Sequence, residues 1–392
     1  MMKALSLPTF TMTNPMQGVT ARHLLLLSAG MLFCIGLVMV ASASMGVAQN
    51  QFGNPFYFFI RHMIYLLIGL TACFVVQRAP VEAWHRLSWL LLAAAFALLV
   101  LVLVPGIGRR INGSMRWIGV AGLTLQPSEF AKFAVVAFVS SYLVRRQEEV
   151  RTHWLGFAKP IAVVGAIVLL LLAEPDFGAS MVTMSAVLGM LFLAGTPLGP
   201  YAVLLTVVVI GGGLLVWLEP YRLQRVLSFT DPWAHAYDSG YQLTQSLIAF
   251  GRGEWFGVGL GKSVQKLFYL PEAHTDFVLA VYAEEFGLVG VLLLITLFWV
   301  LVRSAIRIGQ QAELRDDCFG AYMAYGIAII LGVQALVNIC VNMGLFPTKG
   351  LTLPLVSYGG SSLVIVFVML GVLLRIDSEN SGVALAARGG RA

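Results

Sequence analysis

Residues 84–104 read WHRLSWLLLAAAFALLVLVLV, and the last 18 of these residues carry no charge. An α-helix rises 1.5 Å per residue, so about 20 apolar residues cross the roughly 30 Å hydrocarbon core of a bilayer. The stretch therefore predicts a transmembrane helix, and it sets the pattern for the rest of the chain.

Similar apolar stretches recur along the 392 residues, separated by polar residues, glycine and proline. Hydrophobic residues make up 59% of the chain and charged residues only 11%, whereas about a quarter of a soluble domain is charged. This composition excludes a water-soluble globular protein and predicts an all-α polytopic membrane protein with about ten transmembrane helices. The expected spans are residues 24–45, 56–76, 84–104, 128–144, 157–173, 177–195, 200–218, 277–302, 318–342 and 357–374.

Ten spans would place both ends of the chain on the same side of the membrane. We expect residues 1–23 to be a cytoplasmic N-terminal tail, residues 24–376 the transmembrane domain, and residues 377–392 a frayed cytoplasmic C-terminal tail. Residues 219–276, between spans seven and eight, form the only long polar interruption and are expected to be a large extracytoplasmic loop. Its many aromatic residues argue against disorder, and loops of this length are usually functional.

The chain carries 25 Lys and Arg against 19 Asp and Glu. In a membrane protein such an excess marks cytoplasmic loops rather than a nucleic-acid partner, and no nucleic-acid module is evident. With the N-terminus inside, the inner segments hold 14 of the basic residues, in agreement with the positive-inside tendency. They are Lys3, Arg22, Arg78, Arg86, Arg145, Arg146, Arg151, Lys159, Arg303, Arg307, Arg315, Arg375, Arg388 and Arg391.

Two outer segments nevertheless hold basic residues against this tendency. Guanidinium and ammonium groups bind phosphate, so a lipid headgroup or a lipid-linked phosphate would explain them. Contact with ordinary anionic lipids, or pairing with nearby acidic residues, explains them equally well. The residues are Arg109, Arg110, Arg116, Lys132, Arg222, Arg225, Arg252, Lys262 and Lys266.

Residues 257–261 read Gly-Val-Gly-Leu-Gly and precede Lys262 and Lys266. Glycine lets backbone amides approach an anion, although the spacing is not that of a nucleotide-binding P-loop. Further on, Glu272 and Asp276 are four residues apart and are expected on one helical face where the eighth span begins.

Asp276 is the preferred candidate for a general base. A carboxylate at the membrane boundary is partly desolvated, which raises its pKa and suits it to accept a proton from a hydroxyl group. The alternative is an acidic residue that only caps the first helical turn. Glu129 and Lys132 can pair at i and i+3 inside a span, either as a structural brace or as part of a substrate groove.

Five segments together resemble the SEDS family (shape, elongation, division and sporulation), the polytopic cell-wall polymerases of bacteria. Within the family, residues 344–354 (GLFPTKGLTLP) are similar to the division-type branch rather than the elongation-type branch. The five segments occur in the family's order and are residues 112–118 (NGSMRWI), 126–132 (QPSEFAK), 174–178 (EPDFG), 271–277 (PEAHTDF) and 357–362 (SYGGSS).

The resemblance implies ten helices and an outer catalytic surface that polymerises lipid II into β1,4-linked glycan strands of septal peptidoglycan during cell division. The family's essential aspartate falls on Asp276, which would act as the general base. Candidate substrate-binding residues are Arg116, Glu129, Lys132, Arg225, Lys262, Lys266, Glu272, His274 and Ser361.

The resemblance also implies partners and a location. A divalent cation, Mg²⁺ or Mn²⁺, would help to neutralise the leaving diphosphate, no metal ligands are assigned, and no organic cofactor is expected. The expected partners are lipid II (the undecaprenyl-diphosphate-linked disaccharide pentapeptide), a class B penicillin-binding protein of the FtsI type, the FtsQ, FtsL and FtsB proteins, and membrane lipids, with no nucleic acid. The protein would lie in the bacterial cytoplasmic (inner) membrane at the division septum, with both termini cytoplasmic.

Two other functions stay open from the residues alone. A lipid II flippase would use Glu129 and Lys132 along a translocation pathway and would move substrate as the purified protein. A noncatalytic scaffold of the division machinery would tolerate loss of Asp276. A polymerase, by contrast, would need Asp276 and would stay folded without it.

Overall fold

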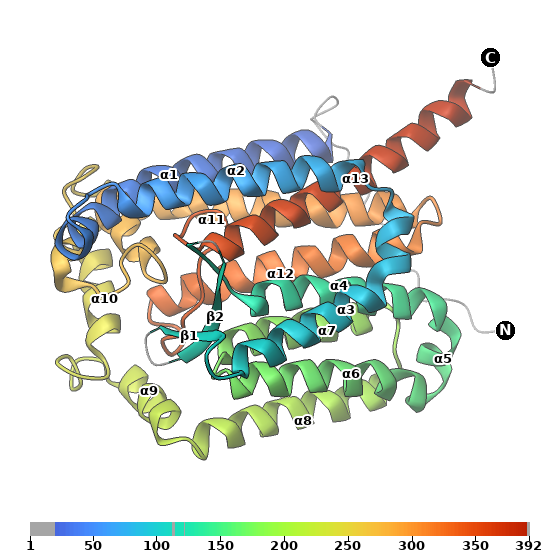
Figure 1. Ribbon diagram of the computed structural model, residues 1–392, viewed down its shortest axis with the longest axis horizontal. Helices are drawn as coiled ribbons and strands as arrows, with labels where there is room; N and C mark the ends of the chain where they lie inside the picture. The colour runs from blue at the N-terminus through green and yellow to red at the C-terminus, as the bar shows by residue number, and fades with distance from the viewer. Residues whose placement is uncertain (1–19, 112–113, 121, 390–392) are drawn as a thin grey trace.

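The computed structural model describes residues 20–111, 114–120 and 122–389, so most of the expected N-terminal tail lies outside the described residues. The long helices run side by side through the bundle (Figure 1). Within the described residues, nine helices are long and apolar enough to cross a membrane, and a tenth apolar helix, α7, has 17 residues. These ten match the ten predicted spans and confirm the polytopic helical fold. They are α1 (Ala21–Phe52), α2 (Tyr57–Arg78), α3 (Val81–Leu103), α4 (Pro127–Arg145), α6 (Trp154–Ala173), α7 (Phe177–Leu193), α8 (Leu198–Trp217), α11 (Val278–Glu313), α12 (Cys318–Asn342) and α13 (Gly360–Gly389).

A small antiparallel sheet lies between α3 and α4, where the sequence analysis placed no regular structure. Its strands, β1 (Gly108–Ile111), β2 (Ser114–Val120) and β3 (Leu123–Leu125), pair in the order β1-β2-β3. The Tyr65 hydroxyl of α2 donates to the Thr124 carbonyl at 3.0 Å, which fastens β3 to the helices. Asn112 and Gly113, which belong to the first family motif, lie outside the described residues.

The long segment 219–276 is folded, as its aromatic content predicted. It contains α9 (Pro220–Thr230), α10 (Tyr241–Gly253) and a π-helical turn, η1 (Gln265–Tyr269). The sheet, α9 and α10 all lie at the same end of the bundle (Figure 1), and we call this the loop end.

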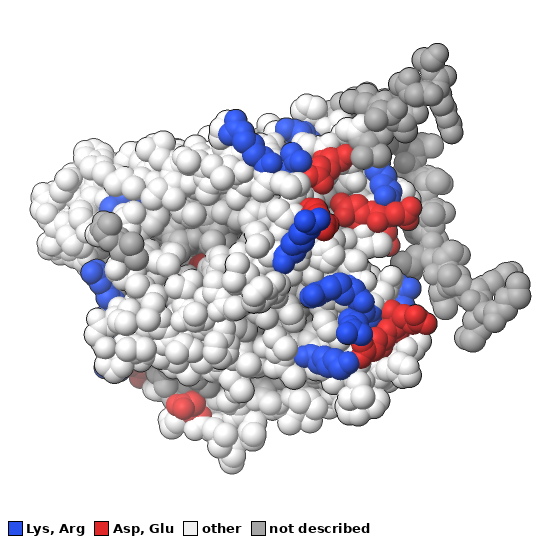
Figure 2. All heavy atoms as spheres, turned by 45° about the vertical axis from the view of Figure 1, so that its right-hand side comes forward, with Lys and Arg blue, Asp and Glu red and all other residues white. Residues whose placement is uncertain are grey.

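The opposite end carries the short helix α5 (Gln147–Thr152) and most of the visible charge (Figure 2). We call it the basic end. Ion pairs join Arg86 to Glu82 at 3.0 Å and Arg375 to Glu379 at 2.7 Å. The amide of Val81, at the start of α3, donates to the carboxylate of Glu379 at 3.1 Å, which joins the start of α3 to α13. The charge asymmetry between the two ends is the one expected from the basic residues in the sequence.

Two predicted boundaries are corrected. The tail expected to fray from residue 377 instead continues α13 to Gly389, because residues 377–388 contain no proline and include three alanines, which favour a helix. The span expected at 277–302 is not one uninterrupted helix: α11 breaks at Gly287, whose φ of 65° lies in the left-handed region. Only glycine adopts that conformation without a steric cost.

The segment between α12 and α13 enters the bundle instead of crossing its surface. Leu351, Leu353, Leu355 and Val356 are all at most 4% exposed. The turn at 355–356 packs against Gly36 in the middle of α1, where an added Cβ would lie 2.4 Å from the Leu355 carbonyl oxygen. This close approach fixes the re-entrant segment 343–359 against α1.

Replacing Gly36 with Ala should therefore push the re-entrant segment away from α1. We expect Gly36→Ala to lower the free energy of unfolding by about 1–3 kcal/mol, the usual cost of overpacking. Thermal unfolding of the purified protein in detergent measures the effect. Gly30→Ala is the matched control on the same helix, because nothing lies within 4 Å of its added Cβ. Equal unfolding temperatures for the two variants would contradict the close packing.

Candidate functional site

Asp276 lies in a turn, residues 271–277, that leads into α11 at the loop end. The expectation that Glu272 and Asp276 share a helical face is wrong, because α11 begins only at Val278. The amides of Thr275 and Phe277 both donate to the Glu272 carbonyl at 3.1 Å, so the backbone folds back on itself. Glu272 has a φ of 57°, which interrupts any helical path through this turn.

Two asparagines of α12 hold the turn in place. The side-chain amides of Asn338 and Asn342 donate to the backbone carbonyl of Asp276 at 2.9 and 3.0 Å. The side-chain Oδ1 of Asn342 also accepts from the amide of Ala280 in the first turn of α11 at 3.2 Å. Asn338 additionally donates to the Leu351 carbonyl at 2.5 Å and so joins the turn to the re-entrant segment.

Arg116 approaches Asp276 from β2. Its Nε donates to the Glu174 carbonyl at 3.2 Å, and another nitrogen of its guanidinium donates to the Pro175 carbonyl. At Gly350 an added Cβ would lie 3.3 Å from the Asp276 Oδ2 and 3.9 Å from the Arg116 Nη1. The absence of a side chain at Gly350 therefore leaves the carboxylate and the guanidinium beside the same small space.

A second guanidinium, that of Arg225 on α9, acts on Asp276 through its charge. Arg225 donates to the Thr348 carbonyl of the re-entrant segment at 3.0 Å. Burial, followed by the charges of Glu272 and Asp176, raises the pKa of Asp276, while Arg116 and Arg225 lower it, and the balance moves the pKa from 3.8 to about 7. Near neutral pH this carboxyl is therefore about half ionised, the condition in which a carboxylate accepts a proton most effectively.

Glu174 is a buried carboxyl group close to this arrangement. It is 0% exposed, and neither of its side-chain oxygens has a hydrogen-bond partner among the described residues. Burial and the neighbouring Asp176 raise the pKa of Glu174 from 4.5 to about 8, with Arg116 opposing them. Asp176 itself caps α7 by accepting from the Ala179 amide at 3.2 Å and also accepts from the Ser128 hydroxyl at 2.9 Å.

Glu129 and Lys132 form an ion pair inside the bundle at 2.9 Å. The Lys132 ammonium also donates to Gln334 of α12 at 2.7 Å, and the Gln334 amide donates to the Thr352 carbonyl at 3.0 Å. Lys132 is 1% exposed and Glu129 6%. The contacts give the pair a structural role that joins α4, α12 and the re-entrant segment, and they favour the brace over a substrate groove.

Two backbone amides of the glycine segment 257–261 donate hydrogen bonds to another part of the protein. The break at Gly287 leaves carbonyls of α11 without helical partners, and the amides of Val258 and Gly259 donate to the carbonyls of Glu284 and Glu285 at 2.9 and 3.1 Å. The anion site expected from the glycines therefore loses these two donors. These amides bind α11 because the backbone of an interrupted helix in a low-dielectric region needs other hydrogen-bond partners.

The two lysines that follow the glycines differ in their surroundings. Lys266 binds the carboxylate of Glu285 at 2.7 Å and the hydroxyl of Ser42 on α1 at 2.8 Å, so it links the loop to the bundle. Lys262 is exposed on the loop. Neither lysine is among the charges that act on Asp276.

His274 and Ser361 make contacts within the protein. The His274 ring lies 4.6 Å from the ring of Phe58 and 5.7 Å from that of Tyr358, measured between ring centroids, and burial lowers the pKa of His274. The Ser361 hydroxyl donates to the Thr124 carbonyl at 3.0 Å and accepts from the Gln126 amide at 2.9 Å, which ties α13 to β3. Their assignment to substrate binding stays a prediction.

The structure thus brings Asp276, Glu272, Arg116 and Arg225 together, with His274 in the same turn packed against Phe58 and Tyr358, and places the other candidates elsewhere. Sequence reasoning missed Asn338 and Asn342, although two asparagines at i and i+4 in an apolar span were a visible signal. It also left Glu174 out of the candidate site residues, although the segment 174–178 carries part of the family resemblance. No sequence pattern indicated that Gly350 would face Asp276, because that contact joins residues 74 positions apart.

Glu174→Gln should stabilise the protein more as the pH rises. The folded state holds the Glu174 proton up to about pH 8, whereas the unfolded state releases it near 4.5, so wild-type stability falls across this interval. We expect the gain of the variant over wild type to grow by about 1.4 kcal/mol per pH unit at most. Thermal unfolding between about pH 5 and pH 8 checks it. The exposed Glu219→Gln is the control, and a gain that stays constant or shrinks with pH would refute the prediction.

Comparisons with known proteins bear on this arrangement. The FtsW/RodA/SpoVE family, described as "cell cycle protein", matches residues 22–382. A protein of Hahella chejuensis called "probable peptidoglycan glycosyltransferase FtsW" is 55% identical over 371 residues, which cover 95% of this chain and 94% of the relative. The protein of the same name from Pseudomonas fluorescens is 55% identical over 346 residues, covering 88% of this chain and 85% of the relative.

Solved structures agree with the helical architecture. One, described as "structural coordination of polymerization and crosslinking by a peptidoglycan synthase complex", has a TM-score of 0.73 and 30% identity, and the match covers 91% of this chain and 97% of that chain. The rod shape determining protein RodA of Thermus thermophilus has a TM-score of 0.68 and 28% identity, with 91% and 96% covered. These matches confirm the resemblance drawn from the motifs. The chain belongs to the FtsW/RodA/SpoVE family of cell cycle proteins.

Proposed function

We propose that this chain is a peptidoglycan glycosyltransferase that polymerises lipid II into β1,4-linked glycan strands, with Asp276 as the general base. The observation that carries the proposal is the Asp276 carboxyl group, whose pKa is about 7 and which lies beside Arg116 and near Arg225 at the loop end. The names of the relatives support the same reaction class.

In this mechanism the Asp276 carboxylate removes the proton from the 4-hydroxyl of the GlcNAc in an incoming lipid II molecule. The hydroxyl oxygen then attacks the anomeric carbon of the growing strand, and the bond from that carbon to the undecaprenyl diphosphate breaks. The attack inverts the anomeric centre from α to β, with no covalent intermediate on the protein. Asp276 finally releases the proton to water.

The two guanidinium groups would stabilise the leaving diphosphate. Arg116 and Arg225 are each oriented by a bond to a backbone carbonyl, so little reorganisation is needed when negative charge develops. A guanidinium also matches a phosphate group in geometry as well as charge. The same two residues moderate the pKa of Asp276, which keeps the base partly ionised at neutral pH.

The expected divalent cation has no cage of protein ligands here. Among residues 20–111, 114–120 and 122–389, no group of three or more His, Cys, Asp and Glu side chains is arranged to hold a metal ion. A Mg²⁺ or Mn²⁺ ion would therefore reach the site with the substrate's diphosphate, which is the usual partner of Mg²⁺ in such enzymes. No step of the mechanism depends on it.

The charge distribution supports an orientation in the membrane. The basic end would face the bacterial cytoplasm with both termini, and the loop end with Asp276 would face outward, where the glycan is needed. We place the protein at the division septum with an FtsI-type class B penicillin-binding protein and the FtsQ, FtsL and FtsB proteins. The relatives called FtsW and the structural neighbour from a peptidoglycan synthase complex support this placement.

Asp276→Asn should abolish polymerisation while leaving the fold intact. The amide keeps the size of the side chain but accepts no proton, and loss of a general base typically lowers the rate by about 100-fold to 10,000-fold. The assay supplies fluorescent lipid II and Mn²⁺ to the chain co-purified with its penicillin-binding protein and resolves the products on a gel.

Asp231→Asn is the matched control, since this exposed aspartate lies in the same long segment. We expect it to leave the glycan ladder unchanged. A ladder that survives Asp276→Asn would move the base elsewhere. If wild type makes no ladder, translocation of lipid II by the purified chain would instead favour the flippase, and its absence the scaffold.

A further inference from the structure

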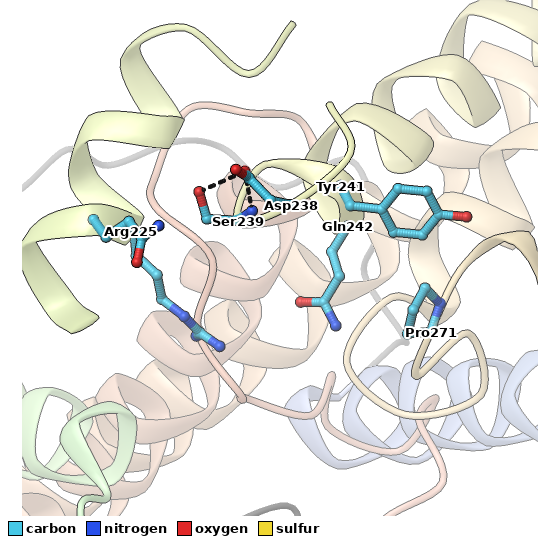
Figure 3. A pocket seen from close by; sticks show the side chains of 7 residues that line it. Arg225, Asp238, Ser239, Tyr241, Gln242 and Pro271 are labelled. Atoms are coloured by element: carbon cyan, nitrogen blue, oxygen red, sulfur yellow. Dashed lines mark hydrogen bonds between the residues drawn. The ribbon is translucent and has the colours of Figure 1, made fainter. Parts of the chain in front are cut away.

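A pocket of about 310 Å³ opens at the loop end, and neither the catalytic proposal nor the sequence analysis uses it (Figure 3). Its wall comes from α9, from the segment that joins α9 to α10 and from the start of α10, and Pro271 also lines it. Two features connect this pocket with the Asp276 site. Arg225 lines the pocket and also acts on Asp276, and Pro271 begins the same turn that carries Asp276.

The lining is polar and balanced in charge. It offers one cation, Arg225, and one anion, Asp238, together with the side chains of Gln224, Gln242 and Ser239. The Arg225 guanidinium and the Gln242 carboxamide extend toward the same side of the view, whereas Asp238 and Ser239 bond to each other above them (Figure 3). The pocket therefore presents both hydrogen-bond donors and hydrogen-bond acceptors.

The lining does not suit all parts of a lipid-linked disaccharide pentapeptide equally. An isoprenoid chain needs a predominantly apolar wall, and six of the seven residues that line this pocket have polar side chains. The diphosphate is assigned to Arg116 and Arg225 together, and Arg116 does not line this pocket. Sugars commonly rest on an aromatic face, but the Tyr241 ring extends away from Arg225 (Figure 3). A short peptide, with its backbone amides, matches the amide side chains of Gln224 and Gln242.

We propose that this pocket binds the peptide stem of the incoming substrate, with the side-chain amides of Gln224 and Gln242 pairing with the peptide's backbone amides. The inference rests on the proposed function, because it assumes that Asp276 deprotonates the same substrate molecule. The volume is at the small end of the usual range for ligand sites, about 300–1,000 Å³, and suits part of a peptide rather than the whole substrate. The stem would thus set the position of the sugar hydroxyl relative to Asp276.

The test measures binding apart from turnover. Fluorescent lipid II with its full pentapeptide, and the same lipid without the peptide, are titrated against the purified chain in detergent. We expect wild type to bind the full substrate about tenfold more tightly, the effect of one or two hydrogen bonds. Gln242→Ala should lose this preference and leave the Kd for the peptide-free lipid unchanged.

Gln245→Ala is the matched control, since it removes the same side chain from the same helix outside the pocket. It should keep the wild-type preference. Equal wild-type affinity for the two lipids would overturn the proposal, and so would a Gln242→Ala variant that weakens both equally. Thermal unfolding of each variant shows whether it is folded, and Gln224→Ala, which should also lose the preference for the full substrate, provides a second variant if Gln242→Ala is not folded. Peptide-dependent binding without any glycan ladder would reject the polymerase and retain the pocket.

Discussion

The structure of the site depends on the bonds from two α12 amides to one backbone carbonyl. Asn338 and Asn342 hold the Asp276 carbonyl, and Asn342 also satisfies an amide at the start of α11. A buried carbonyl without partners would be costly, so the turn has one favourable position against α12. Because Asn338 also binds the re-entrant segment, the base, its helix and Gly350 are fixed as one unit.

Because Asp276 is held in one position, the residues around it set its pKa at the membrane boundary. Desolvation alone would raise the pKa of Asp276 and leave it protonated, while exposure to water would leave it a weak base. Arg116 and Arg225 offset the burial, and each is oriented by a carbonyl of another segment. The Lys132 ion pair and its bonds to α12 and the re-entrant segment hold part of this framework in place, and we assign Lys132 no contact with the reacting groups.

The ten spans could be predicted from the sequence because each apolar stretch carries its own signal, independent of its neighbours. Asp276 could be selected as the candidate base because the family motif that contains it, residues 271–277, is one continuous stretch of sequence. The pairing of Glu272 with Asp276 on a helix was wrong because a turn closed by backbone bonds looks the same in sequence as a helix start. The roles of Gly257 to Gly261 and of Gly350 could not be predicted, since both depend on contacts between distant segments.

The central claim is that Asp276 acts as a base with a pKa near neutrality, and the pH dependence of glycan polymerisation tests it most directly. Initial rates are measured across about pH 5 to pH 9 with lipid II far below its KM, so that the pH profile reports the substrate-free protein. The rate should rise with pH and reach half its maximum near the pKa of about 7. A rate that is flat over this range, as it would be for an aspartate with the ordinary pKa of 3.8, would contradict the account.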